Sequence, residues 1–229
     1  MTTQYRTLGH SGLKVSSVGL GTNNFGGRLD LDASRLVIHK ALDLGINFFD
    51  TADIYGNKGG SETILGKVLG EKRKDIIIAT KFGNAVDDEG KLKGASRRYI
   101  FSAIEASLTR LNTDWIDVYQ IHRPDPDTPI EETIRALDDL ITQGKVRYLG
   151  LSNFAPWQIV EAQLIAESLG AHRFISTQDQ YSLLSRGIEG DYVDAINSVG
   201  LGLLPYSPLA NGLLSGKYKR NQEPPENSP

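Results

Sequence analysis

A carboxylate and a phenol stand close together in residues 47–56, where Asp50 closes a short apolar strand and Tyr55 follows in a loop. A phenol has a pKa of about 10, so it is a weak acid near neutral pH unless a neighbour stabilises its anion. A lysine ammonium does so by charge, and a carboxylate keeps a buried ammonium charged. Lys81 ends the next apolar run, residues 76–80. The three side chains therefore predict a general acid with its tuning groups.

A fourth group joins them from the following strand, residues 115–121, which is closed by His122. An imidazole there could hydrogen-bond the oxygen of a bound carbonyl group. Taken singly, each of the four residues also fits an ordinary turn, packing or surface role. Their common position at strand ends favours the catalytic interpretation.

The elements that must position these residues alternate between strand and helix. Residues 5–8 and 13–15 predict a hairpin around a glycine-bounded turn, and residues 17–21 a short strand. A helix is expected from Asp32 to Gly45, with Leu36, Val37, Ala41 and Leu44 on its inner face. Residues 128–131 read as a capping box, and Ser96 as the cap of a helix through Leu111. Uninterrupted apolar runs such as 76–80 are typical of parallel strands that are covered on both faces.

No change of composition marks a linker, so residues 1–229 are expected to form one α/β domain. A doubly wound sheet and a TIM-type (β/α)8 barrel both fit the alternation. Polar residues decide between them, because they follow six different strands and converge only around a barrel mouth. These residues are Asp50, Lys81, His122, Asn153, Gln178 and Tyr206.

About seven strand–helix units precede residue 207, and the polar, proline-rich residues 221–229 resemble a loop. We therefore expect a barrel whose eighth strand is missing, with an N-terminal β-hairpin. An open barrel leaves unpaired strand edges, so the chain alone is expected to be unstable or inactive.

The composition excludes several other classes of protein. The net charge is −3 and no basic run suggests nucleic-acid binding. The chain has no cysteine, which excludes disulfides and thiolate chemistry. No signal peptide or membrane-spanning run is visible, so we expect a cytoplasmic protein without a membrane partner. No spacing predicts a metal site, and the glycine-rich segments at 19–24 and 212–218 match neither a Rossmann nor a P-loop fingerprint.

Five short motifs, in this order, resemble the aldo-keto reductases over essentially the whole chain. They are Phe-Asp-Thr-Ala-Asp-Ile-Tyr-Gly at 49–56, Ala-Thr-Lys at 79–81, Gln-Ile-His-Arg-Pro-Asp at 120–125, Gly-Leu-Ser-Asn-Phe at 150–154 and Tyr-Ser-Pro-Leu at 206–209. Residues 207–210 and 215–218 are most similar to the longer-loop bacterial branch, which also resembles the potassium-channel beta subunits.

The resemblance implies an NADPH-dependent reduction of an aldehyde or ketone. Tyr55 would be the general acid, assisted by Lys81 and Asp50, and His122 would orient the carbonyl group. Cofactor contacts are implied for residues of the first loop, for groups at the nicotinamide and for the pyrophosphate path. In the first loop they are Thr22 and Asn23. At the nicotinamide they are Ser152, Asn153, Gln178 and Tyr206. Along the pyrophosphate path they are Ser207, Leu209, Ala210 and Lys217. Asp50 would also face the cofactor.

Two other functions remain open at this point. The same scaffold could act without catalysis, as a cofactor-binding or interaction protein like the channel beta subunits. In those subunits the position of His122 is typically asparagine, so the histidine favours a reductase. A different barrel enzyme could use Lys81 as a Schiff-base amine. The physiological substrate, the choice between NADP and NAD, and the oligomeric state do not follow from the sequence.

Overall fold

A computed structural model describes residues 3–225 of the chain. It begins with the predicted hairpin, in which β1 (Tyr5–Thr7) pairs antiparallel with β2 (Lys14–Ser16). The remaining strands form one parallel sheet, in the order of the chain: β3 (Leu20–Gly21), β4 (Phe48–Asp50), β5 (Ile77–Phe82), β6 (Ile116–Ile121), β7 (Val146–Ser152), β8 (Phe174–Gln180) and β9 (Gly202–Tyr206).

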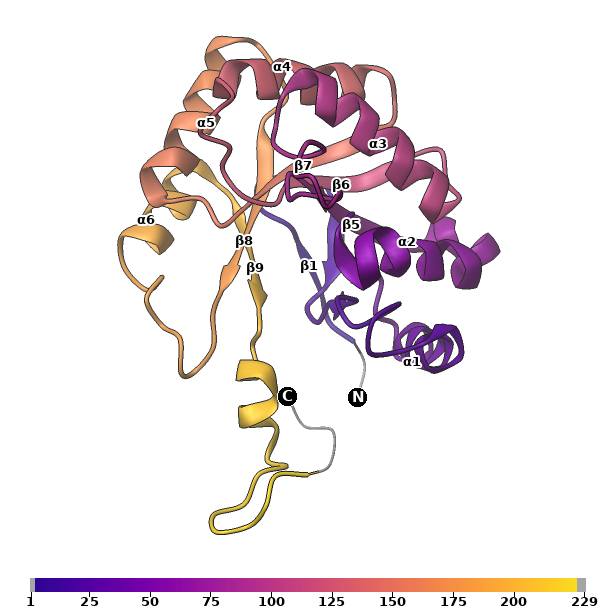
Figure 1. Cartoon of the computed structure of the whole chain (residues 1–229). Coiled ribbons are helices and arrows are strands. Elements are labelled where there is room, and N and C mark those ends of the chain that lie inside the picture. Colours follow the sequence, from indigo (N-terminus) through magenta and orange to yellow (C-terminus); the bar gives the residue numbers. More distant parts are fainter. Residues whose placement is uncertain (1–2, 226–229) are drawn as a thin grey trace.

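Helices follow the strands and cover the outer face of this curved sheet (Figure 1). They are α1 (Leu31–Asp43), α2 (Tyr55–Leu69), α3 (Arg97–Leu111), α4 (Ile130–Thr142), α5 (Pro156–Ser168) and α6 (Asp191–Val199), with short 3-10 helices η1 (Gly70–Asp75) and η2 (Ala210–Ser215). Each strand is hydrogen-bonded to the next in sequence, which is the arrangement of a (β/α) barrel and not of a doubly wound sheet. The predicted partial barrel is therefore confirmed.

Strands β3 and β9 lie at the two ends of the sheet, and within residues 3–225 no eighth parallel strand joins them. The segment after β9 projects away from the barrel (Figure 1). Its last described part, residues 216–225, consists of turns and irregular chain. The predicted loop at 221–229 is thus seen as far as residue 225, and residues 226–229 lie outside the described part.

Two apolar clusters hold the barrel together. The larger one fills the space between strands and helices and includes Phe49, Ile78 and Leu137, all with 0% exposure. The smaller one lies inside the barrel, where Phe48, Ala79 and Val118 meet Leu8 and Val15 of the hairpin. Side chains alternate along a strand. The residues two positions further along these strands, including Asp50 and Lys81, therefore also face the interior, one layer nearer its mouth.

Some local predictions need correction. The cap of α1 is Asp30, whose side chain accepts a hydrogen bond from the Ala33 backbone N–H, and not Asp32. The helix buries Ser34, Ile38 and Ala41. Leu36, Val37 and Leu44, which were expected to face inward, are exposed. At α4, Pro129 is the N-cap and there is no side-chain cap, because the Thr128 hydroxyl donates to Asp125 instead. The Ser96 cap of α3 is confirmed.

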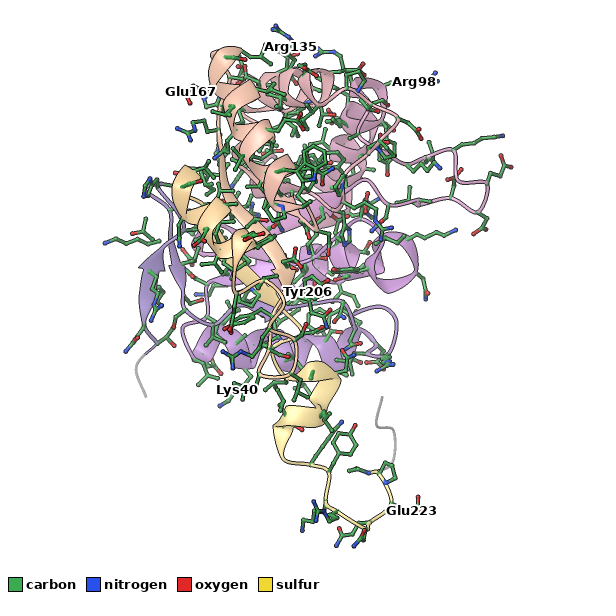
Figure 2. All side chains as sticks on the ribbon, turned by 90° about the vertical axis from the view of Figure 1, so that its left-hand side faces the viewer. Lys40, Arg98, Arg135, Glu167, Tyr206 and Glu223 are labelled. Carbon is green, nitrogen blue, oxygen red and sulfur yellow. The ribbon has the colours of Figure 1, made fainter. Side chains whose placement is uncertain are left out.

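Charged side chains are found on the outer helices and on the projecting segment. Figure 2 shows Arg98 and Arg135 on helices of the barrel, and Glu223 on the projecting segment. None of the helices in residues 3–225 combines the length and the apolar character that a bilayer span requires.

Candidate active site

A cavity of about 690 Å³ opens at the C-terminal ends of the parallel strands. This is the face of the barrel where enzymes of this architecture hold their catalytic groups. Most of the residues predicted from the sequence line it, together with three of their neighbours. The lining residues are Gly21, Thr22, Asn23, Asp50, Tyr55, His122, Arg123, Pro124, Ser152, Asn153, Gln178, Tyr206 and Ser207.

Lys81 lies beneath the cavity with 0% exposure. Its Nζ donates to Asp50 Oδ2 at 2.6 Å and to the Thr51 carbonyl at 2.9 Å, and lies 3.5 Å from the Tyr55 hydroxyl. Burial acts to lower the pKa of Lys81, but Asp50 and Tyr55 outweigh it, so the pKa lies above its ordinary value. The structure thus holds a charged ammonium between the carboxylate and the phenol, as the sequence predicted.

Tyr55 begins α2, where the chain makes an unusual turn. Residues Gly56 to Gly59 all have positive φ angles. A Cβ atom at Gly56 would stand 2.1 Å from the Phe25 carbonyl oxygen, so only glycine fits there. Burial raises the pKa of the Tyr55 phenol, and the nearby Lys81 partly offsets that shift. Tyr55 is therefore protonated at neutral pH, as a proton donor must be, and Lys81 is placed to stabilise the anion it would leave.

His122 stands on the other side of Tyr55. The two rings are 5.8 Å apart and nearly perpendicular, at 85°. Burial lowers the pKa of His122 to about 3, with further contributions from Lys81 and Arg123. The imidazole is therefore neutral at physiological pH and suited to hydrogen bonding rather than to charge stabilisation. Its Nδ1 is buried and has no hydrogen-bond partner among the described residues.

Gln120 is a site residue that the sequence reasoning missed. It lies fully buried in β6, beside Lys81 in the register of the sheet, and its Nε2 donates to Asp50 Oδ1 at 3.1 Å. Gly150 on β7 leaves room for it, because a Cβ there would lie 2.8 Å from the Gln120 side chain. An amide two residues before His122, at a position whose side chain alternates onto the same face as Val118, was the available signal.

The β7–β9 side of the cavity carries amides and a phenol. Gln178 Nε2 donates to Asp50 Oδ1 at 2.8 Å, so the Gln178 side-chain carbonyl oxygen takes no part in this hydrogen bond. Asn153 has a φ of 58° and its Nδ2 donates to the His122 carbonyl and to Ser152 Oγ. Tyr206 donates to Asn153 Oδ1 at 3.0 Å. The structure brings these four predicted residues together around one corner of the cavity.

The predicted cofactor residues divide into two groups by position. Thr22, Asn23 and Ser207 line the cavity, and Thr22 is fixed by hydrogen bonds from both its N–H and its hydroxyl to the Asp50 carbonyl. Leu209, Ala210 and Lys217 do not line it. They belong to the segment after β9, where Leu209 is 53% exposed and Lys217 lies over the Tyr218 ring. Their role at a pyrophosphate stays a prediction.

The donor set of the cavity fits a nicotinamide. A carboxamide needs both donors and acceptors, which the Ser152 hydroxyl and the amides of Asn153 and Gln178 provide. Tyr206 adds an aromatic ring, the kind of group on which a heteroaromatic ring stacks. By contrast, residues 3–225 contain no group of three or more His, Asp or Glu side chains placed to hold a metal ion.

The sequence model of the Aldo/keto reductase family matches residues 17–229. A probable voltage-gated potassium channel subunit beta of rice (Oryza sativa subsp. japonica) is 39% identical over 96% of this chain and 68% of its own length. The uncharacterized oxidoreductase YrpG of Bacillus subtilis is 42% identical over 93% of this chain and 69% of its own length. Versiconal hemiacetal acetate reductase of Aspergillus parasiticus is 38% identical over 98% of this chain and 73% of its own length.

The match covers nearly the whole chain, includes the strands that carry the cavity, and agrees with the barrel topology. The chain belongs to the aldo/keto reductase family.

Proposed function

We propose that this protein is an NADPH-dependent reductase of aldehydes or ketones, in which Tyr55 protonates the carbonyl oxygen. Family membership and the names of two relatives, an oxidoreductase and a reductase, support oxidoreductase chemistry in general. The observation that carries the more specific proposal is the contact of Lys81 with both Asp50 and Tyr55 at the floor of the cavity.

Each of the four predicted catalytic residues has its own role in this proposal. Tyr55 donates its proton to the oxygen as negative charge develops there, and Lys81 stabilises the phenolate that remains. Asp50 keeps Lys81 charged and aimed. His122, which is neutral, donates a hydrogen bond that positions the carbonyl oxygen. When bound, the nicotinamide supplies the hydride to the carbonyl carbon, and Ser152, Asn153, Gln178 and Tyr206 would hold its ring against this corner.

The test is NADPH oxidation by the purified chain against a panel of aliphatic and aromatic aldehydes. Tyr55→Phe removes the proton donor with little change in volume. Tyr181→Phe removes a phenol that bonds Glu189 away from the cavity, and serves as the matched control. Although the open sheet edges led to an expectation of inactivity, the hydrogen-bonded contacts of Asp50, Lys81 and Tyr55 lead us to expect turnover by the wild type and by Tyr181→Phe. For Tyr55→Phe we expect a loss of at least about 100-fold.

Two results would contradict the proposal. Undiminished activity of Tyr55→Phe would remove the phenol from the mechanism. NADPH binding without turnover of any aldehyde would favour the second candidate, a non-catalytic scaffold.

That second candidate rests on one specific observation, the 39% identity to a relative named as a probable potassium channel beta subunit. The intact contacts of Asp50, Tyr55 and Lys81 favour catalysis over it.

A Schiff-base role for Lys81 requires a neutral amine. Because Asp50 and Tyr55 raise the pKa of Lys81, the structure opposes that role. Failure to trap an aldehyde on Lys81 with borohydride would exclude it directly.

A further inference from the structure

Asp53 is a buried acid that the proposed chemistry does not use. It lies two residues before Tyr55 and is 2% exposed. Its backbone N–H donates to the Lys81 carbonyl at 3.0 Å, and the Tyr55 N–H donates to the Ala52 carbonyl at 3.2 Å. The turn that carries the proton donor is thus attached to β5 through Asp53, at the residue that supplies the ammonium.

The carboxyl group of Asp53 is only partly satisfied. Its Oδ2 accepts a hydrogen bond from the Tyr99 hydroxyl of α3 at 3.2 Å. Its Oδ1 is buried and has no hydrogen-bond partner in the described part of the chain. Burial raises the pKa of Asp53 to about 7, and Glu62 adds to the shift, while Tyr99, Arg110 and the Ile54 backbone oppose it.

The charged groups around Asp53 are committed to other partners. Glu62 of α2 accepts from the Thr80 hydroxyl at 2.5 Å and from Arg110 Nε of α3 at 2.7 Å. Lys81 of β5 is paired with Asp50. Tyr119 of β6 is fully buried, and burial holds its pKa well above the ordinary value, so it stays neutral. Within residues 3–225, no cation forms a salt bridge with Asp53 at the usual distance.

We propose that Asp53 is a positioning residue for Tyr55: its carboxyl group bonds the Tyr55 turn to α3, its backbone N–H bonds the turn to β5, and loss of the carboxyl proton slows carbonyl reduction. The inference rests on the proposed function for its effect on turnover. An ionised Asp53 disfavours the phenolate that forms when Tyr55 gives up its proton, because it is a second negative charge nearby. It is also an unpaired buried charge, which works against the compact arrangement of the turn.

The ionisation of Asp53 is separable from those of its neighbours. The pKa of Tyr55 lies above its ordinary value of 10.0, and that of His122 is about 3. A change in rate between pH 6 and pH 8 therefore points to Asp53 and not to either of these groups.

The test compares the pH profile of kcat for the wild type and Asp53→Asn, at saturating NADPH and aldehyde, from pH 5 to pH 9. Asparagine keeps the shape and the acceptor for Tyr99 but cannot ionise. We expect wild-type kcat to fall by about three- to tenfold as pH rises through 7, and the variant to show no such fall. Asp114→Asn removes an exposed acid that forms no side-chain hydrogen bond in the described chain, and should retain the fall.

Tyr99→Phe supplies a second variant that does not alter the acid itself. Because the Tyr99 hydrogen bond lowers the pKa of Asp53, removing it should move the fall to higher pH. A residue that matters only for packing would change kcat equally at every pH. A wild-type profile that is flat near pH 7, or a fall that persists in Asp53→Asn, would overturn the proposal.

A readout without turnover keeps this inference distinct from the proposed function. The NMR shift of the Tyr55 ring carbon bonded to oxygen should show an inflection near pH 7 in the wild type and none in Asp53→Asn. If the wild type reduces no aldehyde, the proposed function fails, and the inflection still supports the coupling of the two residues. Absence of the inflection in the wild type contradicts the coupling whatever the activity.

Discussion

The two sides of the cavity are built in different ways. On the β4–β6 side, Asp50 accepts hydrogen bonds from the buried side chains of Lys81 and Gln120, and it accepts a third from Gln178 of β8. On the β9 side, the Tyr206 side chain makes one hydrogen bond, to Asn153, and the chain then leaves the barrel as an exposed segment. Figure 2 shows Tyr206 close to the point where that segment departs.

The difference fits the roles proposed for the two sides. Proton transfer needs groups that are fixed within a fraction of an ångström, and buried hydrogen bonds from strand residues provide that. Contacts with the distal part of a long cofactor tolerate more movement and suit loops. The comparison predicts that substitutions on the β4–β6 side lower kcat, while those on the β9 side change cofactor binding.

The largest effect is expected for Lys81→Met. It removes the ammonium that, in the proposed mechanism, stabilises the Tyr55 anion, and it leaves Asp50 without its charged partner, so activity should fall by at least about 100-fold. Loss of one partner of a buried ion pair should also lower the free energy of unfolding by about 3–5 kcal/mol. Single-turnover kinetics and urea unfolding measure the two effects.

The double variant Asp50→Asn with Lys81→Met separates stability from chemistry. It should recover part of the lost stability, because no unpaired charge remains, and none of the activity. Recovery of activity would show that the ion pair is structural.

Gln120→Leu comes next in size. It removes a hydrogen bond to a charged group, an interaction that contributes about 1.5–3 kcal/mol, and so loosens the orientation of Asp50. We expect kcat to fall about tenfold, with little change in the Kd for NADPH. Gln163→Leu alters a buried amide that bonds Phe174 in the outer core, and should change stability but not kcat at pH 7.

His122 should contribute a pH dependence of stability. Its folded pKa of about 3 lies below the ordinary value of 6.5, so the unfolded chain binds the proton more readily. Stability attributable to His122 is therefore complete above about pH 6.5 and is lost as the pH falls toward 3. Ring-nitrogen NMR should show a neutral imidazole from pH 5 to pH 9, and a protonated ring in that range would refute the assignment.

The smallest effect is expected for Tyr206→Phe on the β9 side. The ring that could stack on a nicotinamide remains, and only the hydrogen bond to Asn153 is lost. The Kd for NADPH should rise about two- to fivefold, as expected for one neutral hydrogen bond, while kcat stays within about twofold. A large fall in kcat would erase the distinction between the two sides.

The positions of the reacting groups could be predicted because parallel strands end at one face. Asp50, Lys81 and His122 were each predicted at the C-terminal end of a strand, and their convergence with polar residues from three other strands placed them at the barrel mouth. Gln120 was not predicted as a site residue because it lies within its strand and not at the strand's end. Only the alternation of side chains along the strand shows that it faces the interior. Its bond to Asp50 joins residues far apart in sequence, which no local pattern reveals.

Other details depend on competition that the sequence does not resolve. Asp30 and Asp32 are both of a residue type that caps helices well. In the structure Asp30 is the cap, and the helix buries Ile38 and leaves Leu36 exposed. Leu209, Ala210 and Lys217 were predicted near the cavity from family motifs, but they follow the last strand on a segment with few contacts to the barrel. The position of such a segment is set by what packs against it and not by its own sequence.

Tyr55, held in place by Lys81 and Asp50, is the proposed proton donor. The most direct test is single-turnover NADPH oxidation by wild type and Tyr55→Phe, with both saturated with cofactor and with NADPH affinity measured on the same samples. We predict that Tyr55→Phe binds NADPH as the wild type does and transfers hydride at least about 100-fold more slowly. Equal rates at equal cofactor occupancy would contradict the account.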